Sequence, residues 1–197
     1  MHDGPDRISD LKGWKDKVLA AVESALHEQR SARPDLLAQV LSAAPWWSGC
    51  PTATDILDPG AAQAYLRIPL LPAHATNYSV LLIAWPAGHE TPVHDHDGLW
   101  GIELVLDGAL QVESFSLALE DKPHLVSRGS TVLGLGDSAT FSDADFAHRC
   151  RNLSGRKPTL SLHVYGGELE VFRAYAKDTH GDWHATTHRT LREAALT

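Results

Sequence analysis

The histidines of this chain, whose imidazole side chains bind transition metals, occur at spacings that suit a shared site. His94 and His96 are separated by one residue, so on a β-strand their side chains would point to the same face. His148 lies on a second segment much later in the chain. Three imidazoles of this kind can hold iron, zinc, copper or nickel and leave coordination positions open. The pattern predicts a mononuclear metal site formed by His94, His96 and His148.

A polar row of Ser161, His163 and Tyr165 alternates with apolar residues in the segment that follows His148. Residues 152–158, which lie between them, are rich in turn formers and predict a hairpin loop. In a symmetric hairpin His148 would lie directly across from His163, because both are equally distant from its centre. The row would then line the metal-containing interior as a catalytic row outside the ligand set. We expect His163 to hold the Tyr165 hydroxyl group and Ser161 to orient His163.

Composition and charge exclude several classes of protein. The chain has 197 residues, a formal charge of −8 and a pI near 5.8, which disfavours nucleic acid and anionic membranes as partners. No apolar run approaches the ~20 residues of a membrane span, and the first residues lack the apolar core of a secretory signal. Two cysteines are too few for a disulfide scaffold. We therefore expect a cytoplasmic protein that acts on a small molecule and has no obligate protein partner.

The pattern of apolar residues divides the chain into a helical start and a β-rich remainder. Residues 1–50 have apolar side chains at helical spacing and predict a cap of two helices. Between residues 60 and 180, short apolar runs such as 159–165 alternate with glycine-containing turns. Many short strands of this kind predict a mainly β fold, a double-stranded β-helix or jelly-roll-like barrel. We expect one domain over 1–197, with the helical cap at 1–50 and the barrel core at 60–180.

The metal-site residues resemble the two motifs of the cupin superfamily. The first motif joins a glycine, a His-x-His pair, an acid and a second glycine, and the second motif ends in His-x-x-x-Asn. The matching positions here are Gly88, His94, His96, Gly108, His148 and Asn152. The resemblance implies a cupin barrel whose interior holds the metal.

The acidic ligand of the first cupin motif is missing from this chain. It usually falls four or five residues after the second histidine, where Trp100 and Gly101 stand here. Glu103 is the nearest acid, but it lies an odd number of residues after His96. On a continuous strand its side chain should therefore face away from the metal. With the acid absent, the resemblance implies three neutral histidine ligands.

A three-histidine cupin with a Ser-x-His-x-Tyr segment resembles the cysteine dioxygenase, or thiol dioxygenase, family. The resemblance covers about Tyr65 to Tyr165. It implies one iron(II) per chain on the three histidines and the Ser-His-Tyr row as the catalytic groups. The implied reaction adds both atoms of O2 to the sulfur of a small thiol and gives a sulfinic acid. Animal members also have a cysteine, cross-linked to the tyrosine, where this chain has Gly101, so the cross-link should be absent.

Substrate choice is expected to depend on Tyr65 and Arg67, which match the Tyr-x-Arg of cysteine-type family members. A guanidinium grips a carboxylate with two parallel hydrogen bonds, which neither lysine nor glutamine reproduces. The resemblance therefore implies a carboxylate-bearing thiol, with L-cysteine as the first choice. Residues 99–101 look more like the branch that takes 3-mercaptopropionate, so 3-mercaptopropionate, mercaptosuccinate and other small thiols are alternatives. Arg67 could also be an ordinary solvated strand residue.

A metal cupin that is not an oxygenase is the more distant alternative. It would be a small-molecule-binding module with a structural metal, or an isomerase or decarboxylase with a different metal. The polar row beside an open metal site favours the oxygenase. The apolar-faced helices at the start of the chain also lack the basic recognition helix of a DNA-binding regulator.

Several other polar residues are expected to have structural or surface roles. Asp95 alternates to the face opposite His94 and His96, and we interpret it as structural. Cys150 shares the facing of His148 but is interpreted as a small buried hydrophobe. Five further histidines are expected at the surface, namely His89, His124, His180, His184 and His188.

Overall fold

The computed structural model describes residues 5–28, 34–43, 47–57, 65–119, 122–141 and 145–190. Its helices are α1 (Pro5–Glu28), α2 (Pro34–Ala43) and α3 (Ala53–Ile56). Its strands are β1 (Leu66–Pro69), β2 (Ser79–Trp85), β3 (Val93–His94), β4 (Gly101–Asp107), β5 (Leu110–Leu119), β6 (Pro123–Leu133), β7 (Ser138–Phe141), β8 (Phe146–Asn152), β9 (Thr159–Tyr165), β10 (Val171–Lys177) and β11 (Trp183–Arg189). Within the described ranges, no helix combines the length and apolar character that a membrane crossing needs.

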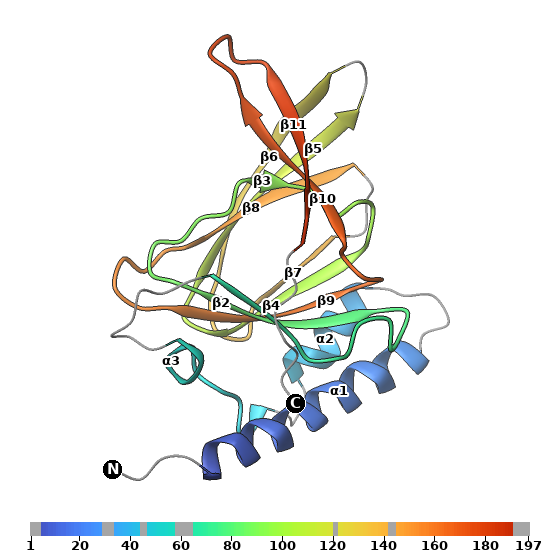
Figure 1. The fold of residues 1–197 in the computed structure, drawn as a ribbon, viewed down its shortest axis with the longest axis vertical. Helices are drawn as coiled ribbons and strands as arrows, with labels where there is room; N and C mark the ends of the chain where they lie inside the picture. The colour runs from blue at the N-terminus through green and yellow to red at the C-terminus, as the bar shows by residue number, and fades with distance from the viewer. Residues whose placement is uncertain are drawn as a thin grey trace.

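The strands form two antiparallel sheets that face each other (Figure 1). The first sheet has the order β1-β2-β9-β4-β7, and the second has the order β11-β10-β3-β8-β5-β6. Strands that are consecutive in the chain, such as β8 and β9, often lie in opposite sheets, which is the winding of a double-stranded β-helix. The predicted mainly β cupin barrel with helices at its start is confirmed.

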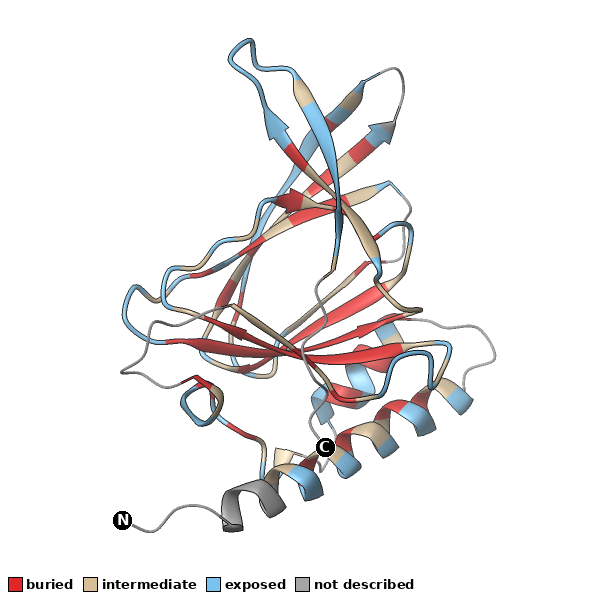
Figure 2. Ribbon diagram, viewed as in Figure 1, coloured by how far each residue is buried: buried red, intermediate tan, exposed pale blue. Residues whose placement is uncertain are grey.

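The helices cover the outer face of the first sheet (Figure 1). Apolar side chains of α1, including Trp14 and Val18, share one buried cluster with Leu160, Leu162 and Val164 of β9. The alternate residues of β9 point into the space between the sheets. Strands β2, β4 and β9 are therefore buried on both faces, as Figure 2 shows. The strand with the polar row consequently has a packed apolar layer behind it.

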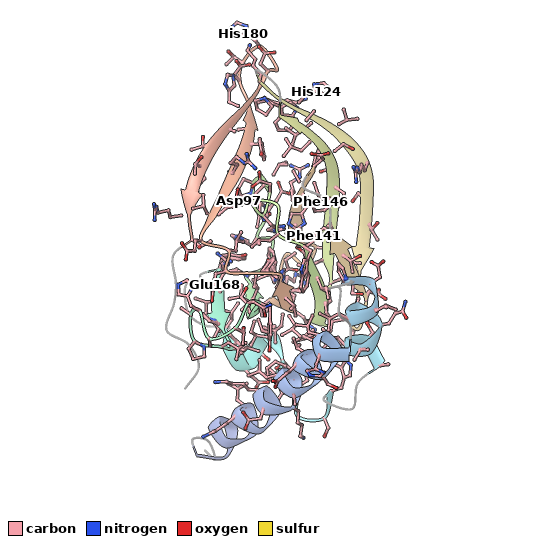
Figure 3. The ribbon with its side chains drawn as sticks, turned by 90° about the vertical axis from the view of Figure 1, so that its right-hand side faces the viewer. Asp97, His124, Phe141, Phe146, Glu168 and His180 are labelled. Atoms are coloured by element: carbon pink, nitrogen blue, oxygen red, sulfur yellow. The ribbon has the colours of Figure 1, made fainter. Side chains whose placement is uncertain are left out.

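The second sheet extends away from the helices as two hairpins, β5–β6 and β10–β11. Their tips, marked by His124 and His180 in Figure 3, lie at the end of the molecule opposite α1. Buried side chains including Phe115 and Tyr175 form a separate small core in this sheet. Strand β11 reaches Arg189, so the β region extends beyond the predicted boundary at residue 180.

The predicted hairpin between His148 and His163 is wrong, because β8 and β9 lie in different sheets. Strand β8 pairs with β3 and β5, and His148 lies directly across from His94. Strand β9 pairs with β2 and β4, and His163 lies across from Leu81 and Glu103. Turn-forming residues mark a chain reversal, but they do not specify which sheet the next strand joins. The two segments still meet, because both line the space between the sheets.

Glu103 points into the barrel interior, which contradicts the prediction that it faces away from the metal site. After β3 the chain turns through Asp97, with φ 52°, and Gly98, with φ 78°, before β4 begins in the other sheet. Side-chain alternation can be counted only along a continuous strand, so this turn resets it. Glu103 is 1% exposed and lies directly across from His163 on the interior face of the first sheet.

Candidate functional site

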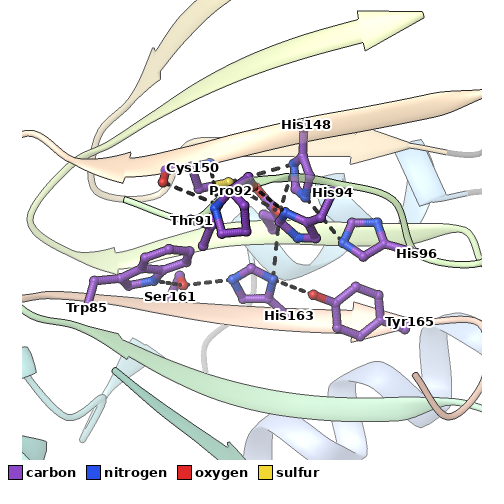
Figure 4. Close-up of polar contacts among 11 residues, drawn as sticks. Trp85, Thr91, Pro92, His94, His96, His148, Cys150, Ser161, His163 and Tyr165 are labelled. Atoms are coloured by element: carbon purple, nitrogen blue, oxygen red, sulfur yellow. Dashed lines mark hydrogen bonds and ion pairs between the residues drawn. The ribbon is translucent and has the colours of Figure 1, made fainter. Parts of the chain in front are cut away.

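Strands β3 and β8, with the loop that follows β3, bring the three predicted metal ligands together (Figure 4). His94 on β3 lies across from His148 on β8, and His96 lies in the loop. One ring nitrogen from each lies within 4.8 Å of the other two. The Nε2 atoms of His96 and His148 are 3.2 Å apart. His96 and His148 are buried and His94 is half-buried, so the cluster lies just inside the barrel.

Oxygen atoms lie close to the Nδ1 atoms of two of these imidazoles, on the side away from the cluster. His94 Nδ1 donates to the Pro92 carbonyl oxygen at 3.0 Å, and His148 Nδ1 lies 3.3 Å from Glu103 Oε1. A proton held at Nδ1 leaves the Nε2 lone pair free for a metal. An ion about 2.0–2.1 Å from each imidazole nitrogen needs nitrogen–nitrogen distances of roughly 3 Å. The residues present therefore fit a metal ion bound by three imidazoles.

Burial keeps the three imidazoles neutral. Desolvation lowers the pKa of His94 below its usual value of 6.5. Desolvation, reinforced by the neighbouring histidines, lowers the pKa of His96 and His148 well below that value. Neutral ligands cannot compensate the charge of a divalent cation, so a bound metal would attract an anionic donor.

A hydrogen-bonded row faces the histidine cluster from the first sheet (Figure 4). Ser161 Oγ is 2.8 Å from His163 Nε2, and His163 Nδ1 is 3.0 Å from the Tyr165 hydroxyl oxygen. Trp85 Nε1 donates to Ser161 Oγ at 2.8 Å and adds a fourth member to the predicted row. Because both ring nitrogens of His163 have partners in the row, neither is free to bind the metal.

Burial also determines the protonation of the row. Desolvation, with the nearby Arg67 charge, lowers the pKa of His163 to about 3, so its imidazole is neutral and has one N–H. Desolvation raises the pKa of Tyr165 well above its usual value of 10.0, so its hydroxyl group keeps its proton. The row can thus donate a hydrogen bond from Tyr165 at neutral pH.

Glu103 lies between the histidine cluster and the row, and Cys150 of β8 contacts it. Glu103 Oε1 is 3.3 Å from His148 Nδ1 and 3.9 Å from His163 Nδ1. The Cys150 thiol donates to Glu103 Oε2 at 3.4 Å. Burial raises the pKa of Glu103 to about 8 and that of Cys150 well above its usual value of 9.0. Cys150 faces the same interior as His148, as its position in the sequence predicts.

Asp95 ties the loop that holds His96 to strand β10. Its carboxylate accepts hydrogen bonds from Arg173 Nε at 2.6 Å, from the Arg173 backbone N–H at 3.0 Å and from the Tyr175 hydroxyl at 2.6 Å. Its own backbone N–H donates to the Arg173 carbonyl oxygen at 3.0 Å. These contacts agree with the structural role expected for Asp95.

A cavity of about 200 Å³ opens beside His94 and Tyr165. Tyr65 and Arg67, the predicted substrate-binding residues, both line it. Arg67 lies across from Ile83 of β2, whose side chain belongs to the interior cluster, so Arg67 is on the interior face of β1. The structure therefore places all the predicted site residues around one cavity and the interior behind it.

His89 also lines this cavity, so the prediction of a plain surface role for it is wrong. Its ring stacks on Tyr65, with ring centroids 4.7 Å apart and planes 13° apart. The Tyr65 ring in turn meets the edge of Trp85. The other four histidines expected at the surface are exposed.

Comparison with known proteins identifies the family. The sequence profile of cysteine dioxygenase type I matches residues 62–178. The chain belongs to this family. Cysteine dioxygenase type 1 of Homo sapiens is 26% identical over 102 residues, and that of Danio rerio is 28% identical over 103 residues. Each alignment covers 52% of this chain and 51% of the relative, so the chain spans about half the length of the curated cysteine dioxygenases it matches.

Solved structures of cupin-type proteins show only low similarity to the chain. The Cnp3 cupin domain of Schizosaccharomyces pombe has a TM-score of 0.42 and 12% identity, covering 56% of this chain and 66% of its own. A double-stranded β-helix protein of Klebsiella pneumoniae has a TM-score of 0.44 and 19% identity, covering 64% of this chain and 96% of its own. These scores say nothing about what this cysteine dioxygenase family member binds.

Gly101 occupies the position at which animal cysteine dioxygenases are expected to have the cross-linking cysteine. It lies directly across from Tyr165 and from Phe141. A Cβ atom here would lie 2.2 Å from the Phe141 ring and 2.9 Å from the Tyr165 ring. Phe141 also stacks on His96, with ring centroids 4.3 Å apart and planes 20° apart. The space that a cysteine would need is filled by a phenylalanine that packs on a candidate metal ligand.

Besides His89, the sequence did not identify Trp85 and Glu103 as site residues. Trp85 ends an apolar strand, and its only polar signal is the indole N–H, which usually finds an acceptor when buried. Glu103 interrupts the apolar run of β4. An acid within such a run is rarely buried unless it has partners, and this signal could have placed it inside.

Proposed function

We propose that this chain is an iron(II)-dependent thiol dioxygenase that adds both atoms of O2 to the sulfur of L-cysteine and gives a sulfinic acid. The observation that supports this most directly is a three-imidazole cluster facing a Ser-His-Tyr hydrogen-bonded row beside one small cavity. Membership in the cysteine dioxygenase type I family supports the reaction class and the choice of iron. The enzyme would contain one iron per chain and act in the cytoplasm, where its free cysteines stay reduced.

His94, His96 and His148 would hold the iron. When bound, iron(II) would supply open coordination positions at which a thiolate sulfur and dioxygen can react. The three ligands are neutral, so the substrate thiolate is the group that balances charge in the site. Burial of His96 and His148 at 3% and 1% exposure limits competition from water at this position.

The row delivers a hydrogen-bond donor to the substrate cavity, and Trp85 sets its direction. An indole N–H can only donate, so Ser161 Oγ is its acceptor. The serine hydroxyl is then free to donate to His163 Nε2, which leaves the single imidazole proton at Nδ1.

With its proton at Nδ1, His163 donates to the Tyr165 hydroxyl oxygen. The Tyr165 proton is thereby released from the row and can point into the cavity that Tyr165 lines. A phenol held this way can donate to a reacting oxygen or to substrate, and can transfer a proton during the reaction. The row would thus act by holding the Tyr165 hydroxyl proton toward the cavity.

Arg67 would bind the substrate carboxylate. It lines the same cavity as His94 and Tyr165, which supports this role. A two-pronged grip on a carboxylate would orient the thiol toward the histidine cluster. Thiols that have a carboxylate should therefore be preferred over cysteamine, which lacks one.

Oxygen uptake by the iron-loaded protein tests the proposal. The panel is L-cysteine, 3-mercaptopropionate, mercaptosuccinate and cysteamine, with sulfinate product identified by mass spectrometry. We expect L-cysteine to give the highest kcat/KM, and a higher value for another carboxylated thiol would change only the substrate assignment. Absence of uptake with every thiol would overturn the dioxygenase function and favour a non-oxygenase metal cupin.

The Arg67→Gln variant tests how the carboxylate is bound. We expect a higher KM for L-cysteine, unchanged iron content and a smaller gap between L-cysteine and cysteamine, because glutamine lacks the charge and the fork geometry of arginine. If the wild-type protein oxidises cysteamine as efficiently as every carboxylated thiol, the proposal that Arg67 binds the substrate carboxylate is wrong.

A further inference from the structure

Glu103 is a buried acid in direct contact with one candidate metal ligand, and no step of the proposed reaction uses it. Its Oε1 atom lies 3.3 Å from His148 Nδ1, on the edge of the imidazole away from the other ligands. The opposite nitrogen, His148 Nε2, faces His96 at 3.2 Å. Glu103 therefore contacts the back of a ligand and does not belong to the cluster of three nitrogens.

We propose that Glu103 is a positioning residue that accepts a hydrogen bond from His148 Nδ1–H and thereby aims the Nε2 lone pair at the metal. At the corresponding nitrogen of His94, the structure has a hydrogen bond to the Pro92 carbonyl oxygen at 3.0 Å. A carboxylate behind an imidazole fixes its tautomer and ring orientation and raises its basicity as a ligand. Glu103 thus acts through His148 and is not itself one of the three ligands. The inference rests on the proposed metal site.

A different arrangement is possible in principle, because Glu103, His148 and Cys150 also form a cluster of the right size to hold a metal. Both clusters would need His148. The Cys150 Sγ atom donates to Glu103 Oε2 at 3.4 Å and also lies 3.7 Å from His148 Nδ1. The two arrangements make opposite predictions for Cys150, because only a metal held by the thiol would depend on it.

Metal affinity measured by competition with a chelator tests the role of Glu103, with Co²⁺ as the probe on the whole 197-residue chain. The Glu103→Met variant keeps the volume but removes the acceptor, and we expect its affinity to fall ~10–100-fold. Glu103→Gln keeps an acceptor oxygen without the charge, so its loss should be smaller. Cys150→Ala is the matched control, and we expect its affinity to stay within about threefold of wild type.

Nitrogen NMR of the Zn²⁺-loaded protein with labelled histidine gives a second readout, which a merely structural role would not move. We expect His148 of the wild-type protein to have its proton on Nδ1. The resonance of that proton should be shifted strongly downfield by the hydrogen bond to Glu103. This downfield shift of the His148 Nδ1 proton should be smaller in Glu103→Gln and absent in Glu103→Met. Circular dichroism of the metal-free variants checks folding, and if Glu103→Met does not fold, the Glu103→Gln result decides.

The outcomes separate this inference from the metal site on which it rests. If wild type binds no Co²⁺, or if His148→Ala binds it equally well, the proposed metal site is wrong. If wild type binds one Co²⁺ but Glu103→Met binds it within threefold of wild type, only the role of Glu103 is overturned. A loss of affinity in Cys150→Ala as large as in Glu103→Met would also overturn it, in favour of the thiol-containing cluster.

Discussion

Gly101 begins strand β4 at a point where the barrel interior has no room for a side chain. A Cβ atom built on it would lie 2.2 Å and 2.4 Å from two atoms of the Phe141 ring and 2.9 Å from the Tyr165 ring. Its backbone does not have the positive φ that favours glycine, so the obstacle is packing alone. The Gly101→Ala substitution therefore isolates the cost of one methyl group.

The direction of the stability change distinguishes two effects of the added methyl group, namely restriction of the unfolded chain and overfilling of the folded interior. Where a methyl group fits, Gly→Ala stabilises a protein by about 0.4–1 kcal/mol because it restricts the unfolded chain. Where it overfills a well-packed interior, the cost is typically about 1–3 kcal/mol. We expect Gly101→Ala to lower the free energy of unfolding by about 1–3 kcal/mol. With a urea m-value of about 2 kcal/mol/M, the unfolding midpoint would fall by roughly 0.5–1.5 M.

Urea unfolding of the metal-free protein, followed by tryptophan fluorescence, is the assay. The Phe141→Leu background is the control, because a smaller side chain there leaves space for the methyl group. The cost of Gly101→Ala should be lower in that background, which a double-mutant cycle measures as a coupling energy. An unchanged or higher midpoint for Gly101→Ala, or an equal cost in both backgrounds, would refute the packing of Phe141 against Gly101.

Three further predictions concern the site directly. His94→Ala, His96→Ala and His148→Ala should each abolish stoichiometric iron and activity, and elemental analysis of the purified variants would detect any that keeps its metal. Tyr165→Phe should keep its iron and lose about 10²–10⁴-fold in rate, and full turnover in this variant would rule out the proposed role of Tyr165. Peptide mass spectra of the wild-type protein should show no thioether at Tyr165. Asp95→Ala should lower the free energy of unfolding by roughly 1–3 kcal/mol, because it leaves buried donors without an acceptor, and an unchanged denaturation midpoint would contradict that role.

Side-chain alternation along single strands could be predicted from the sequence, and it located most of the site. Ser161, His163 and Tyr165 lie on one uninterrupted strand, β9, whose predicted and observed bounds agree. Within such a strand the period of two is imposed by backbone geometry, so it is independent of the partners. The expected convergence of His94 and His148 also appears, although through a different strand pairing.

The connections between strands could not be predicted, and the wrong predictions for the His148–His163 pairing and for the facing of Glu103 follow from them. The turn at Asp97 and Gly98 breaks the alternation that was counted from His96 to Glu103. Gly108 likewise has a positive φ, 83°, as a tight turn requires, but the strands on either side of it belong to different sheets. Local turn chemistry determines that the chain reverses, whereas packing of the whole barrel determines which strand becomes the neighbour.

The strand with the Ser-His-Tyr row, β9, and the strand with His94, β3, differ in how many neighbouring elements stabilise them. The row lies on β9, in the middle of a sheet that has helices behind it, whereas β3 has two residues and is held by β8, β10 and the Asp95 contacts. Short elements with few neighbours open locally far more often than the whole domain unfolds. Exchange of the metal should therefore follow the local opening of β3, at a rate that does not depend on global stability. Substitutions in α1 would then weaken the fold without hastening metal loss, and the amide hydrogens of β3 would exchange with solvent long before those of β9.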